Sequence, residues 1–523
     1  MYDQDSIRTL ADISGLQARV RPDAPALWFE GRTTSFADLE TAGNRCAHAL
    51  IGAGLQPGDR VAVLAKNNDQ FFALWLGCIK ARACLAPVNW RLAPPEIGFI
   101  LKDSGAKVLV CGADFTDVVD TVVADCPDIR RLVQFEPGHP RWPSFDQWTA
   151  EHPDGDPGLS VEPDDDVIQL YTSGTTGMPK GVQLTHANYL ALFEGAMSSG
   201  WGDFEAGKST LVAMPLFHVA GVNTGLLAML QGVRAVIVRE VSLPEILALL
   251  PRERIAYAFL VPAVINMLLQ TPGVEEADFS SLERVFYGAS PISEDVLTRA
   301  TARLGASFTQ LYGLTETIGG GTYLPPEAHD PARGKLRSCG VPWPNFEVRI
   351  VTPEGAAAGP GEVGEIQLRS PGIMKGYWKR PQATAEAVDA EGWFRTGDAG
   401  YLDADGYVYI HDRVKDMIVT GGENVYPAEV ENAIFGHPAV ADCAVIGVPD
   451  ERWGEAVKAV VVLRPGAAAD PAEIIAHART RIAGYKAPKS VDFIDVLPRN
   501  PSGKVLRREL REPYWAGRER RVG

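Results

Sequence analysis

A run rich in glycine, serine and threonine, with a lysine as its second-last residue, stands at residues 173–181 and could bind phosphate. The run reads SGTTGMPKG and follows an apolar strand predicted at Val167–Thr172. Glycine lets the backbone approach a ligand, and hydroxyl and amide groups donate hydrogen bonds to anionic oxygens. Lys180 adds a positive charge, while Pro179 stands where a Walker A loop has glycine beside its lysine. The run therefore predicts a phosphate loop of another type, with a solvent-facing turn as the alternative.

Alternating helices and strands must hold this loop in place. Ser35 can cap a helix over residues 35–51, and a second helix is predicted over residues 69–83. Short apolar strands are predicted at residues 60–65 and 106–111. Such alternation is typical of a mainly parallel sheet covered by helices, so the first third of the chain is predicted to be α/β.

The later parts of the chain have a different character. Over residues 330–412 the helical periodicity fades, and short strands marked by glycine and proline predict a small β-rich subdomain. From about residue 416, strands alternate with a helix that Asp470 can cap and Pro471 can begin. This last region predicts a small α+β domain of its own.

The composition excludes several kinds of protein. Fifty basic residues against 66 acidic residues give a formal net charge of −16, so we expect no nucleic-acid partner. The seven cysteines form no CxxC pair, which indicates reduced thiols in a cytoplasmic protein. The uncharged stretch between Lys208 and Arg234 contains proline, histidine and glycines, so we expect it to line a pocket rather than to span a membrane. Peripheral membrane contact and a homodimer stay open.

Ordered motifs over most of the chain resemble those of the adenylate-forming superfamily, which includes acyl-CoA synthetases, peptide-synthetase adenylation domains and beetle luciferases. The first motif is YTSGTTGMPKGV at residues 171–182. The others are PLFHVAG at 215–221, FYGASP at 286–291, LYGLTET at 311–317, FRTGD at 394–398, HDRVKDMIVTGGENVYPAEVE at 411–431 and LPRNPSGKVLRREL at 497–510. The resemblance is closest to bacterial fatty-acyl-CoA synthetases, with feruloyl- and steroid-acid-type ligases nearby. It implies a large N-terminal domain of α/β subdomains with a small β-barrel-like subdomain, followed by a small mobile α+β domain.

The resemblance implies that the chain activates a carboxylic acid with ATP. Attack of the carboxylate on the α-phosphate gives a mixed anhydride whose leaving group is AMP, so the site must supply positive charge and positioning. By resemblance, adenine lies between the backbone at residues 288–290 and the ring of Tyr312, and Asp398 accepts hydrogen bonds from the ribose. The implied ATP- and AMP-binding residues are Thr172, Ser173, Gly174, Thr175, Thr176, Gly177, Lys180, Gly288, Ala289, Ser290, Tyr312, Gly313, Thr315, Asp398 and Arg413.

Catalytic roles follow from the same resemblance. Glu316 and Thr175 are the implied ligands of Mg²⁺, a hard cation that prefers oxygen. Lys504 is the implied catalytic lysine, which bridges the carboxylate and the α-phosphate. His218 is counted with these three among the catalytic residues.

A hinge is implied at residues 413–416, with Lys415 at the hinge position, between an N-terminal domain at 1–412 and a C-terminal domain at 417–523. Rotation about it would withdraw Lys504 after adenylation and bring in the channel for coenzyme A. The implied channel residues are Gly421, Gly422, Glu423 and Asn424. We therefore expect an ATP-dependent acyl-CoA synthetase that uses Mg²⁺ and takes coenzyme A as co-substrate.

The identity of the acid is the open part of this prediction. Phe217, His218 and Val222 are expected to line the acyl pocket, and His218 stands where amino-acid-activating domains carry an acidic residue. Residues 319–321, all glycine, either leave room for a bulky acyl group or form a turn. We predict a medium- or long-chain fatty acid, with a hydroxycinnamate, aryl or steroid-side-chain acid as alternatives. A ligase that loads a carrier protein is a further alternative, although no inserted segment like that of fatty-acyl-AMP ligases is obvious.

Overall fold

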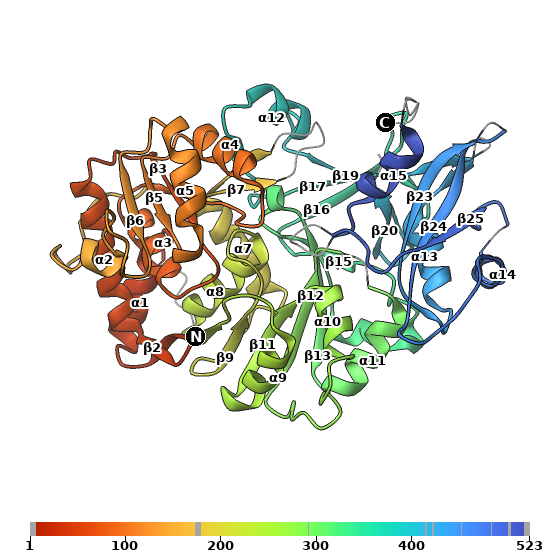
Figure 1. Ribbon diagram of the computed structural model, residues 1–523, viewed down its shortest axis with the longest axis horizontal. Coiled ribbons are helices and arrows are strands. Elements are labelled where there is room, and N and C mark those ends of the chain that lie inside the picture. The colour runs from red at the N-terminus through yellow and green to blue at the C-terminus, as the bar shows by residue number, and fades with distance from the viewer. Residues whose placement is uncertain are drawn as a thin grey trace.

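The computed structural model describes residues 7–172, 179–290, 292–413, 416–420, 423–450, 452–482, 484–499 and 504–516. Within these ranges the strands form four sheets, and Figure 1 shows them from the red N-terminal part to the blue C-terminal part. The helices are α1 Ala11–Val20, α2 Phe36–Gly52, α3 Gln70–Lys80, α4 Pro94–Ser104, α5 Thr116–Val122, α6 Phe145–Thr149, α7 His186–Ser198, α8 Val219–Gln231, α9 Leu243–Arg252, α10 Pro262–Leu268, α11 Glu294–Leu304, α12 Pro381–Ala387, α13 Pro427–Phe435, α14 Pro471–Arg479 and α15 Arg507–Trp515.

The largest sheet is mainly parallel. In pairing order its strands are β15 Val341–Pro342, β14 Gly321–Leu324, β13 Ser307–Gly313, β12 Arg284–Gly288, β11 Ile255–Leu260, β9 Ser209–Val212, β10 Arg234–Ile237, β1 Pro25–Phe29 and β2 Arg32–Ser35. Six neighbouring strands of this sheet, β13, β12, β11, β9, β10 and β1, run parallel to one another. Helices α8 to α11 connect the strands β9 to β13 along the chain. Because parallel neighbours need such crossovers, the carboxyl ends of β12 and β13 meet at one edge of the sheet.

A second sheet holds the strand that leads into the predicted phosphate loop. In pairing order it consists of β18 Gly376–Tyr377, β8 Lys180–Thr185, β7 Asp166–Thr172, β4 Cys84–Pro87, β3 Arg60–Leu64, β5 Val108–Cys111 and β6 Arg131–Gln134. The expected α/β alternation is confirmed here. The cap of α2 is present as predicted, because Ser35 Oγ accepts a hydrogen bond from the backbone N–H of Asp38 at 3.1 Å.

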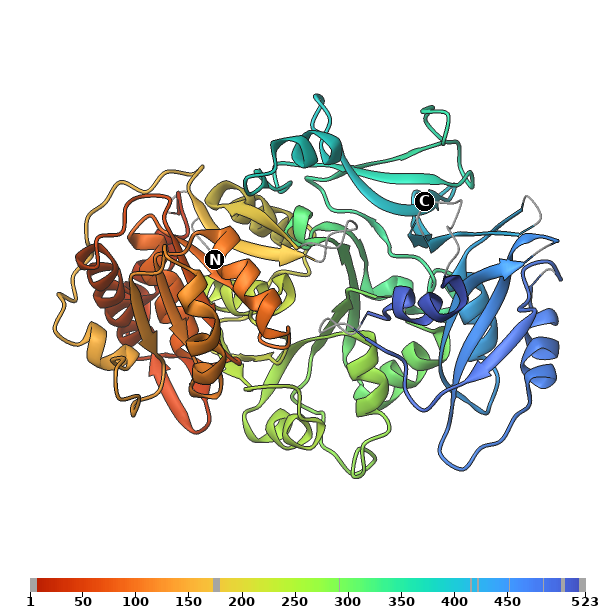
Figure 2. The ribbon, with the colours of Figure 1, turned by 45° about the horizontal axis from the view of Figure 1, so that its top comes forward.

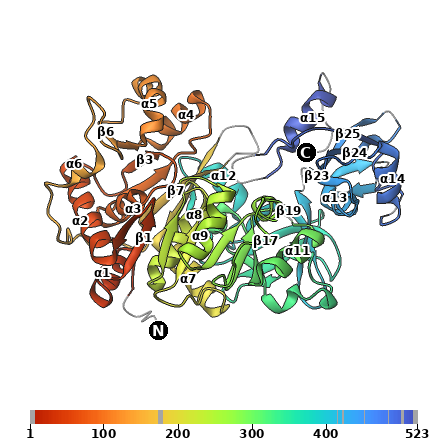
Figure 3. The same cartoon turned by 60° about the horizontal axis from the view of Figure 1, so that its bottom comes forward.

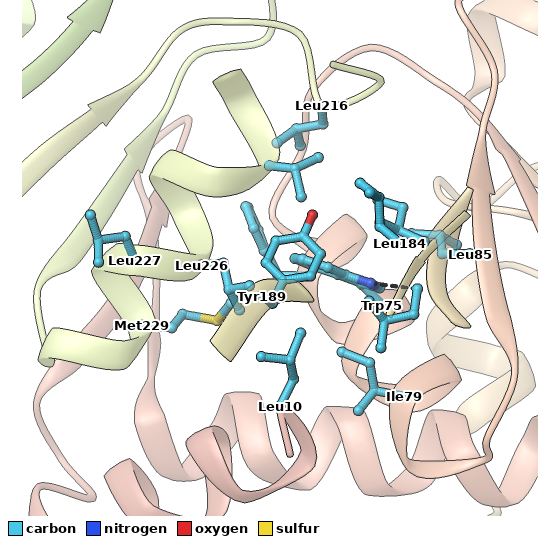
Figure 4. Close-up of a cluster of buried hydrophobic side chains, with 14 of the residues drawn as sticks. Leu10, Trp75, Ile79, Leu85, Leu184, Tyr189, Leu216, Leu226, Leu227 and Met229 are labelled. Carbon is cyan, nitrogen blue, oxygen red and sulfur yellow. Dashed lines mark hydrogen bonds between the residues drawn. The ribbon is translucent and has the colours of Figure 1, made fainter. Parts of the chain in front are cut away.

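The main hydrophobic core includes residues of both of these sheets, and Figure 4 shows a part of it around Trp75 and Tyr189. Helix α3 reads QFFALWLGCIK, and every residue from Phe71 to Lys80 in it is buried. Trp75 and Tyr189 are fully buried with their ring centroids 5.8 Å apart, and the indole N–H of Trp75 donates to the carbonyl of Val167 at 2.9 Å. This bond ties α3 to β7, so the strand before the predicted phosphate loop is fixed by the core.

The β-rich subdomain and the last domain complete the chain. Figure 2 shows the subdomain in teal above the other sheets, with antiparallel strands β16 Glu347–Val351, β17 Gly364–Arg369, β19 Phe394–Leu402 and β20 Val408–Arg413. The blue region in Figure 3 has the strands β22 Glu423–Val425, β21 Ile418–Thr420, β24 Gly454–Leu463, β23 Val440–Asp450 and β25 Ser490–Phe493. Its helices α13 and α14 pack against this sheet. The predicted α/β class with a small α+β C-terminal region is confirmed.

The uncharged stretch before Arg234 is α8 and the segments that flank it. No helix in the described part of the chain has the length and apolar character needed to cross a membrane.

Candidate active site

Strands β7 and β8 bring together the two ends of the predicted phosphate loop. They pair in antiparallel fashion, with Thr172 opposite Lys180. The predicted loop residues Ser173, Gly174, Thr175, Thr176 and Gly177 lie outside the described residues. Thr172, at the end of β7, and Lys180, at the start of β8, therefore lie side by side in the second sheet.

A buried hydrogen bond joins two of the predicted nucleotide-binding residues. Tyr312, near the end of β13, donates its hydroxyl to Asp398 Oδ2 of β19 at 2.8 Å. Asp398 is 6% exposed, and its backbone N–H donates to Thr396 Oγ1 at 3.0 Å. Burial, and after it the negative charge of Asp398, raises the pKa of Tyr312 well above its usual value. The tyrosine therefore stays a hydrogen-bond donor and holds the carboxylate in one position.

The carboxyl ends of β12 and β13 approach each other too closely for side chains. A Cβ at Gly288 would lie 2.1 Å from the carbonyl oxygen of Leu311, and one at Gly313 would lie 2.4 Å from the carbonyl carbon of Gly319. Ala289 has a φ of 68°, a left-handed conformation that costs a residue with a Cβ roughly 1–2 kcal/mol. Ser290 follows it, and both positions lie at the sheet edge where ligands of α/β proteins bind.

A second tyrosine connects the predicted magnesium ligand to the phosphate-loop lysine. Glu316 lies in a short 3₁₀ turn at Thr315–Thr317, and its Oε1 accepts a hydrogen bond from the hydroxyl of Tyr377 at 2.9 Å. Lys180 Nζ lies 4.9 Å from the centroid of the same ring. Strand pairing explains the position, because Tyr377 of β18 stands opposite Val182 of β8.

Sequence reasoning assigned no role to Tyr377. It stands in the run MKGYW at residues 374–378, and its distance in sequence from Glu316 hides their contact. The only local signal is a tyrosine after a glycine and shortly before Pro381, which begins α12.

An apolar cavity of about 110 Å³ adjoins this edge of the sheet. Helix α8 contributes Val219, Ala220, Asn223, Thr224 and Leu227 to its lining. From the sheet side the cavity is lined by Thr210, Phe259, Phe286, Ala289, Leu311, Gly313 and Gly319, and from the remaining sides by Leu192, Phe193, Ala196, Trp201, Phe204 and Trp343. Because Ala289 and Gly313 are among the lining residues, the cavity lies directly beside the predicted nucleotide-binding residues.

Three predicted acyl-pocket residues lie outside the lining of this cavity, and their role stays a prediction. Phe217, His218 and Val222 are absent from the lining of this cavity. At 100° per residue, the lining positions of α8 share one side of the helix and Val222 falls on the other, while His218 precedes the helix as its N-cap. Asn223 and Thr224 stand on the lining side, so the polar positions of α8 mark the side that faces the cavity.

His218 is partly buried next to Phe217, with ring centroids 4.6 Å apart. Its Nε2 has no hydrogen-bond partner among the described residues. Burial, and after it the charge of Arg91, lowers the pKa of His218 to about 4. The imidazole is therefore neutral near pH 7.

The glycine triplet forms part of the cavity wall. Gly319 has a φ of 81° and lines the cavity. A Cβ at Gly320 would lie 2.8 Å from the ring of Phe346 and 3.2 Å from that of Trp343. The segment therefore turns at Gly319, and the space beside Gly320 is occupied by the protein's own rings, while room for a bulky acyl group stays a prediction.

The C-terminal region carries the other predicted site residues. Arg413 ends β20, and strand pairing places its backbone opposite Asp398. Glu423 and Asn424 lie in β22, whereas Lys415, Gly421 and Gly422 lie outside the described residues. Lys504 is partly buried and directly precedes Val505, which forms a β-bridge with Arg499.

Comparison with known proteins fits this geometry. The family model described as AMP-binding enzyme matches residues 16–378, and the model of the AMP-binding enzyme C-terminal domain matches residues 429–504. A fatty acid–[acyl-carrier-protein] ligase, ScoC, of Streptomyces coeruleorubidus is 43% identical over 99% of this chain and 98% of its own length. A feruloyl-CoA synthase of an Amycolatopsis species is 41% identical over 95% of this chain and 97% of its own length.

Among solved structures, a fatty acyl-CoA synthetase of Mycobacterium tuberculosis matches with a TM-score of 0.77 and 35% sequence identity. The match covers 98% of this chain and 100% of that one. The resemblance seen in the motifs is thereby confirmed, and the chain belongs to the AMP-binding enzyme family.

Proposed function

We propose that the protein is an ATP-dependent acyl-CoA synthetase. In the first half-reaction a carboxylate attacks the α-phosphate of ATP, an acyl-adenylate forms and pyrophosphate leaves. In the second, the thiol of coenzyme A attacks the acyl carbonyl, a C–S bond forms, AMP leaves and the thiol proton passes to solvent. The observation that carries the proposal is that the ends of β12 and β13 bear the nucleotide motifs on one side and the apolar cavity on the other.

The described residues suit a nucleotide. Asp398, held by Tyr312, is positioned to accept hydrogen bonds from the ribose hydroxyls, as carboxylates do in dinucleotide sites. Gly288 pairs with Leu311, the residue before Tyr312, so adenine would lie between the backbone at residues 288–290 and the ring of Tyr312. Thr172 and Lys180 would contact the phosphates together with the loop residues Ser173, Gly174, Thr175, Thr176 and Gly177.

Magnesium fits the residues at the phosphate end of the site. Glu316 offers a carboxylate oxygen, and together with Thr175 it would supply the hard oxygen donors that Mg²⁺ prefers, while Thr315 would contact the phosphate oxygens. Bound Mg²⁺ would neutralise charge on the phosphates. Lys504 would approach the α-phosphate and the carboxylate and stabilise the charge that develops between them.

In this proposal the C-terminal domain rotates between the two half-reactions, so that thioester formation takes place with this domain in a second orientation. We infer an N-terminal domain over residues 1–412, a hinge over 413–416 that contains Lys415, and a C-terminal domain over 417–523. Rotation would exchange Lys504 for Gly421, Gly422, Glu423 and Asn424, which would line the path of the pantetheine chain. All seven cysteines are free and buried, which fits a cytoplasmic enzyme.

One observation favours a second candidate function. The relative from Streptomyces coeruleorubidus is named a ligase that uses an acyl-carrier protein. The acyl acceptor of the present chain could therefore be the pantetheine thiol of a carrier protein instead of that of coenzyme A.

The deciding measurement is release of pyrophosphate and AMP over a panel of acids, with coenzyme A, with a pantetheinylated carrier protein, and without a thiol. We expect pyrophosphate release with ATP and an apolar acid, and rapid AMP release when coenzyme A is present. AMP release with the carrier protein alone would establish the second candidate. Failure of every acid to release pyrophosphate would contradict both.

Replacing Tyr377 by phenylalanine should weaken binding of magnesium–ATP by about tenfold and leave magnesium-free binding of ATP unchanged. The change removes the hydroxyl that orients Glu316 and keeps the ring beside Lys180. A hydrogen bond to a charged group contributes roughly 1.5 kcal/mol or more, and groups behind a metal ligand typically alter metal affinity about 10-fold or more. Isothermal titration of ATP with magnesium and with chelator measures both values.

Tyr401→Phe is the matched control, because Tyr401 stacks on Tyr409 in the β-rich subdomain with centroids 4.9 Å apart. It should leave both affinities unchanged. Equal weakening of both by Tyr377→Phe would show that Tyr377 supports the fold of the site and does not position Glu316.

A further inference from the structure

The end of helix α4 lies beside the two strands that flank the predicted phosphate loop. Asp103 is in the last turn of α4, and β7 and β8 pair so that Thr172 stands opposite Lys180. The last four carbonyl groups of a helix have no partner within the helix, and a helix C-terminus favours cations. The carbonyl oxygen of Asp103 can therefore accept hydrogen bonds from other segments of the chain.

The carboxylate of Asp103 holds the strand that leads into the loop. Its Oδ2 accepts a hydrogen bond at 2.9 Å from the hydroxyl of Tyr171, the second-last residue of β7. The same hydroxyl accepts a hydrogen bond at 2.9 Å from Nε2 of Gln169, which is fully buried. Burial, and after it the negative charge of Asp103, raises the pKa of Tyr171 above its usual value. The hydroxyl therefore keeps its proton and stays a donor to Asp103.

Asp103 also holds the segment that lies along the strand leaving the loop. The guanidinium of Arg380 donates to Oδ1 of Asp103 at 2.9 Å. The carbonyl of Asp103 accepts from the indole Nε1 of Trp378 and from Nζ of Lys379, both at 3.0 Å. The backbone N–H of Trp378 donates to the carbonyl of Gly181 in β8 at 2.8 Å. One residue at the end of α4 therefore binds β7 directly and β8 through its neighbours.

The same segment carries the tyrosine that contacts the predicted magnesium ligand. Tyr377 directly precedes Trp378, and its hydroxyl donates to Glu316 Oε1 at 2.9 Å. The backbone N–H of Met374 donates to the carbonyl of Glu316 at 2.7 Å. A shift of this segment away from Asp103 would therefore disturb the contacts of Glu316 as well as those of β8.

Arg60 of β3 completes the network on the other face of Trp378. Its guanidinium lies 3.4 Å from the centroid of the Trp378 ring, and its Nε donates to Oε1 of Gln169 at 3.2 Å. Arg60 is 5% exposed and pairs with Asp166 at 2.6 Å. Polar networks whose members are buried and paired make a structure rigid. The contacts close into a ring whose members are Arg60, Gln169, Tyr171, Asp103 and Trp378.

We propose that Asp103 is a positioning residue for the first half-reaction, because it fixes the two strands from which the phosphate-binding residues extend. Thr172 follows Tyr171, and Lys180 precedes Gly181, so displacement of either strand would displace one of these residues. The inference rests on the proposed function, in which Thr172 and Lys180 contact the phosphates of ATP. An acyl-adenylate retains only the α-phosphate, so the second half-reaction should depend much less on Asp103.

Replacing Asp103 by alanine should raise the KM for ATP in ATP–pyrophosphate exchange about tenfold, the effect typical of one lost hydrogen bond to a charged group. The KM for the acid and the rate of thioester formation from supplied acyl-adenylate should stay within about twofold, because neither step uses the β- and γ-phosphates. Equal losses in both half-reactions, or an unchanged KM for ATP, would overturn the inference. Absence of pyrophosphate exchange in the unchanged protein would instead contradict the proposed function.

Tyr171→Phe tests the bond to β7 in a variant that keeps the carboxylate paired with Arg380. It should raise the KM for ATP about threefold or more. Added to Asp103→Ala, it should raise the KM by no more than about twofold further, because Tyr171 acts through Asp103. An unchanged KM in Tyr171→Phe, or additive effects in the double variant, would refute the network. Asp120→Ala is the matched control: it breaks an exposed aspartate–arginine pair on α5 and should leave the KM for ATP unchanged.

Discussion

Replacing Lys504 by alanine should lower the rate of acyl-adenylate formation by roughly 10²–10³-fold while largely sparing thioester formation from supplied acyl-adenylate. The reason is that the first half-reaction brings two anions together, whereas the second starts from an adenylate already formed. ATP–pyrophosphate exchange measures the first rate, and liquid chromatography of acyl-CoA made from synthetic acyl-adenylate measures the second.

Ion pairs explain why Lys504 would act in only one half-reaction. The segments on either side of it are bound to the C-terminal region, because Arg499 pairs with Asp442 at 2.6 Å and Arg507 with Glu431 at 2.8 Å. Arg511 of α15 pairs at 3.0 Å with Asp416, the last residue of the predicted hinge. Lys504 should therefore move with the C-terminal domain as one body.

The matched control for Lys504 is Arg508→Ala, which removes an exposed positive charge from the same part of the chain. It should leave both rates within about twofold, because exposed charges far from a partner contribute little. If Lys504→Ala slowed both half-reactions equally, the lysine would support a step common to both, such as binding of the acid, and the assigned role would be wrong.

Helices could be predicted from the sequence where one short segment contains both the capping residues and the apolar positions. The helix capped by Ser35 and Asp38 is present as α2, and the capped helix after Asp470 is present as α14. In both cases the cap, the first turn and the apolar face lie within one run of residues, so no distant contact can override them.

Contacts between distant segments could not be predicted in this way. Tyr312 and Asp398 were assigned separately, but their 2.8 Å bond depends on how β13 meets β19. Tyr377 reaches Glu316 only because β18 adds to the edge of β8. In α8 the prediction placed Val222 at the pocket, whereas the lining of the cavity found here comes from the side of the helix that carries Asn223 and Thr224.

Replacing Asp398 by alanine should weaken ATP binding by roughly 10–100-fold, since a hydrogen bond to a charged group contributes roughly 1.5–3 kcal/mol. The same change removes the Asp398 carboxylate from the buried hydroxyl of Tyr312, which should lower the free energy of unfolding by roughly 1 kcal/mol. Calorimetric titration with a non-hydrolysable ATP analogue and thermal unfolding without nucleotide measure the two effects.

Tyr312→Phe separates the two contributions of this pair. It removes the hydroxyl and keeps both the aromatic ring for adenine and the carboxylate for ribose. We expect a loss of stability of roughly 1 kcal/mol, and a loss of ATP affinity at least several-fold smaller than that of Asp398→Ala. If the phenylalanine variant bound ATP as weakly as the alanine variant, Asp398 would act only by orienting Tyr312. A carboxylate that binds the ribose directly requires the two variants to differ.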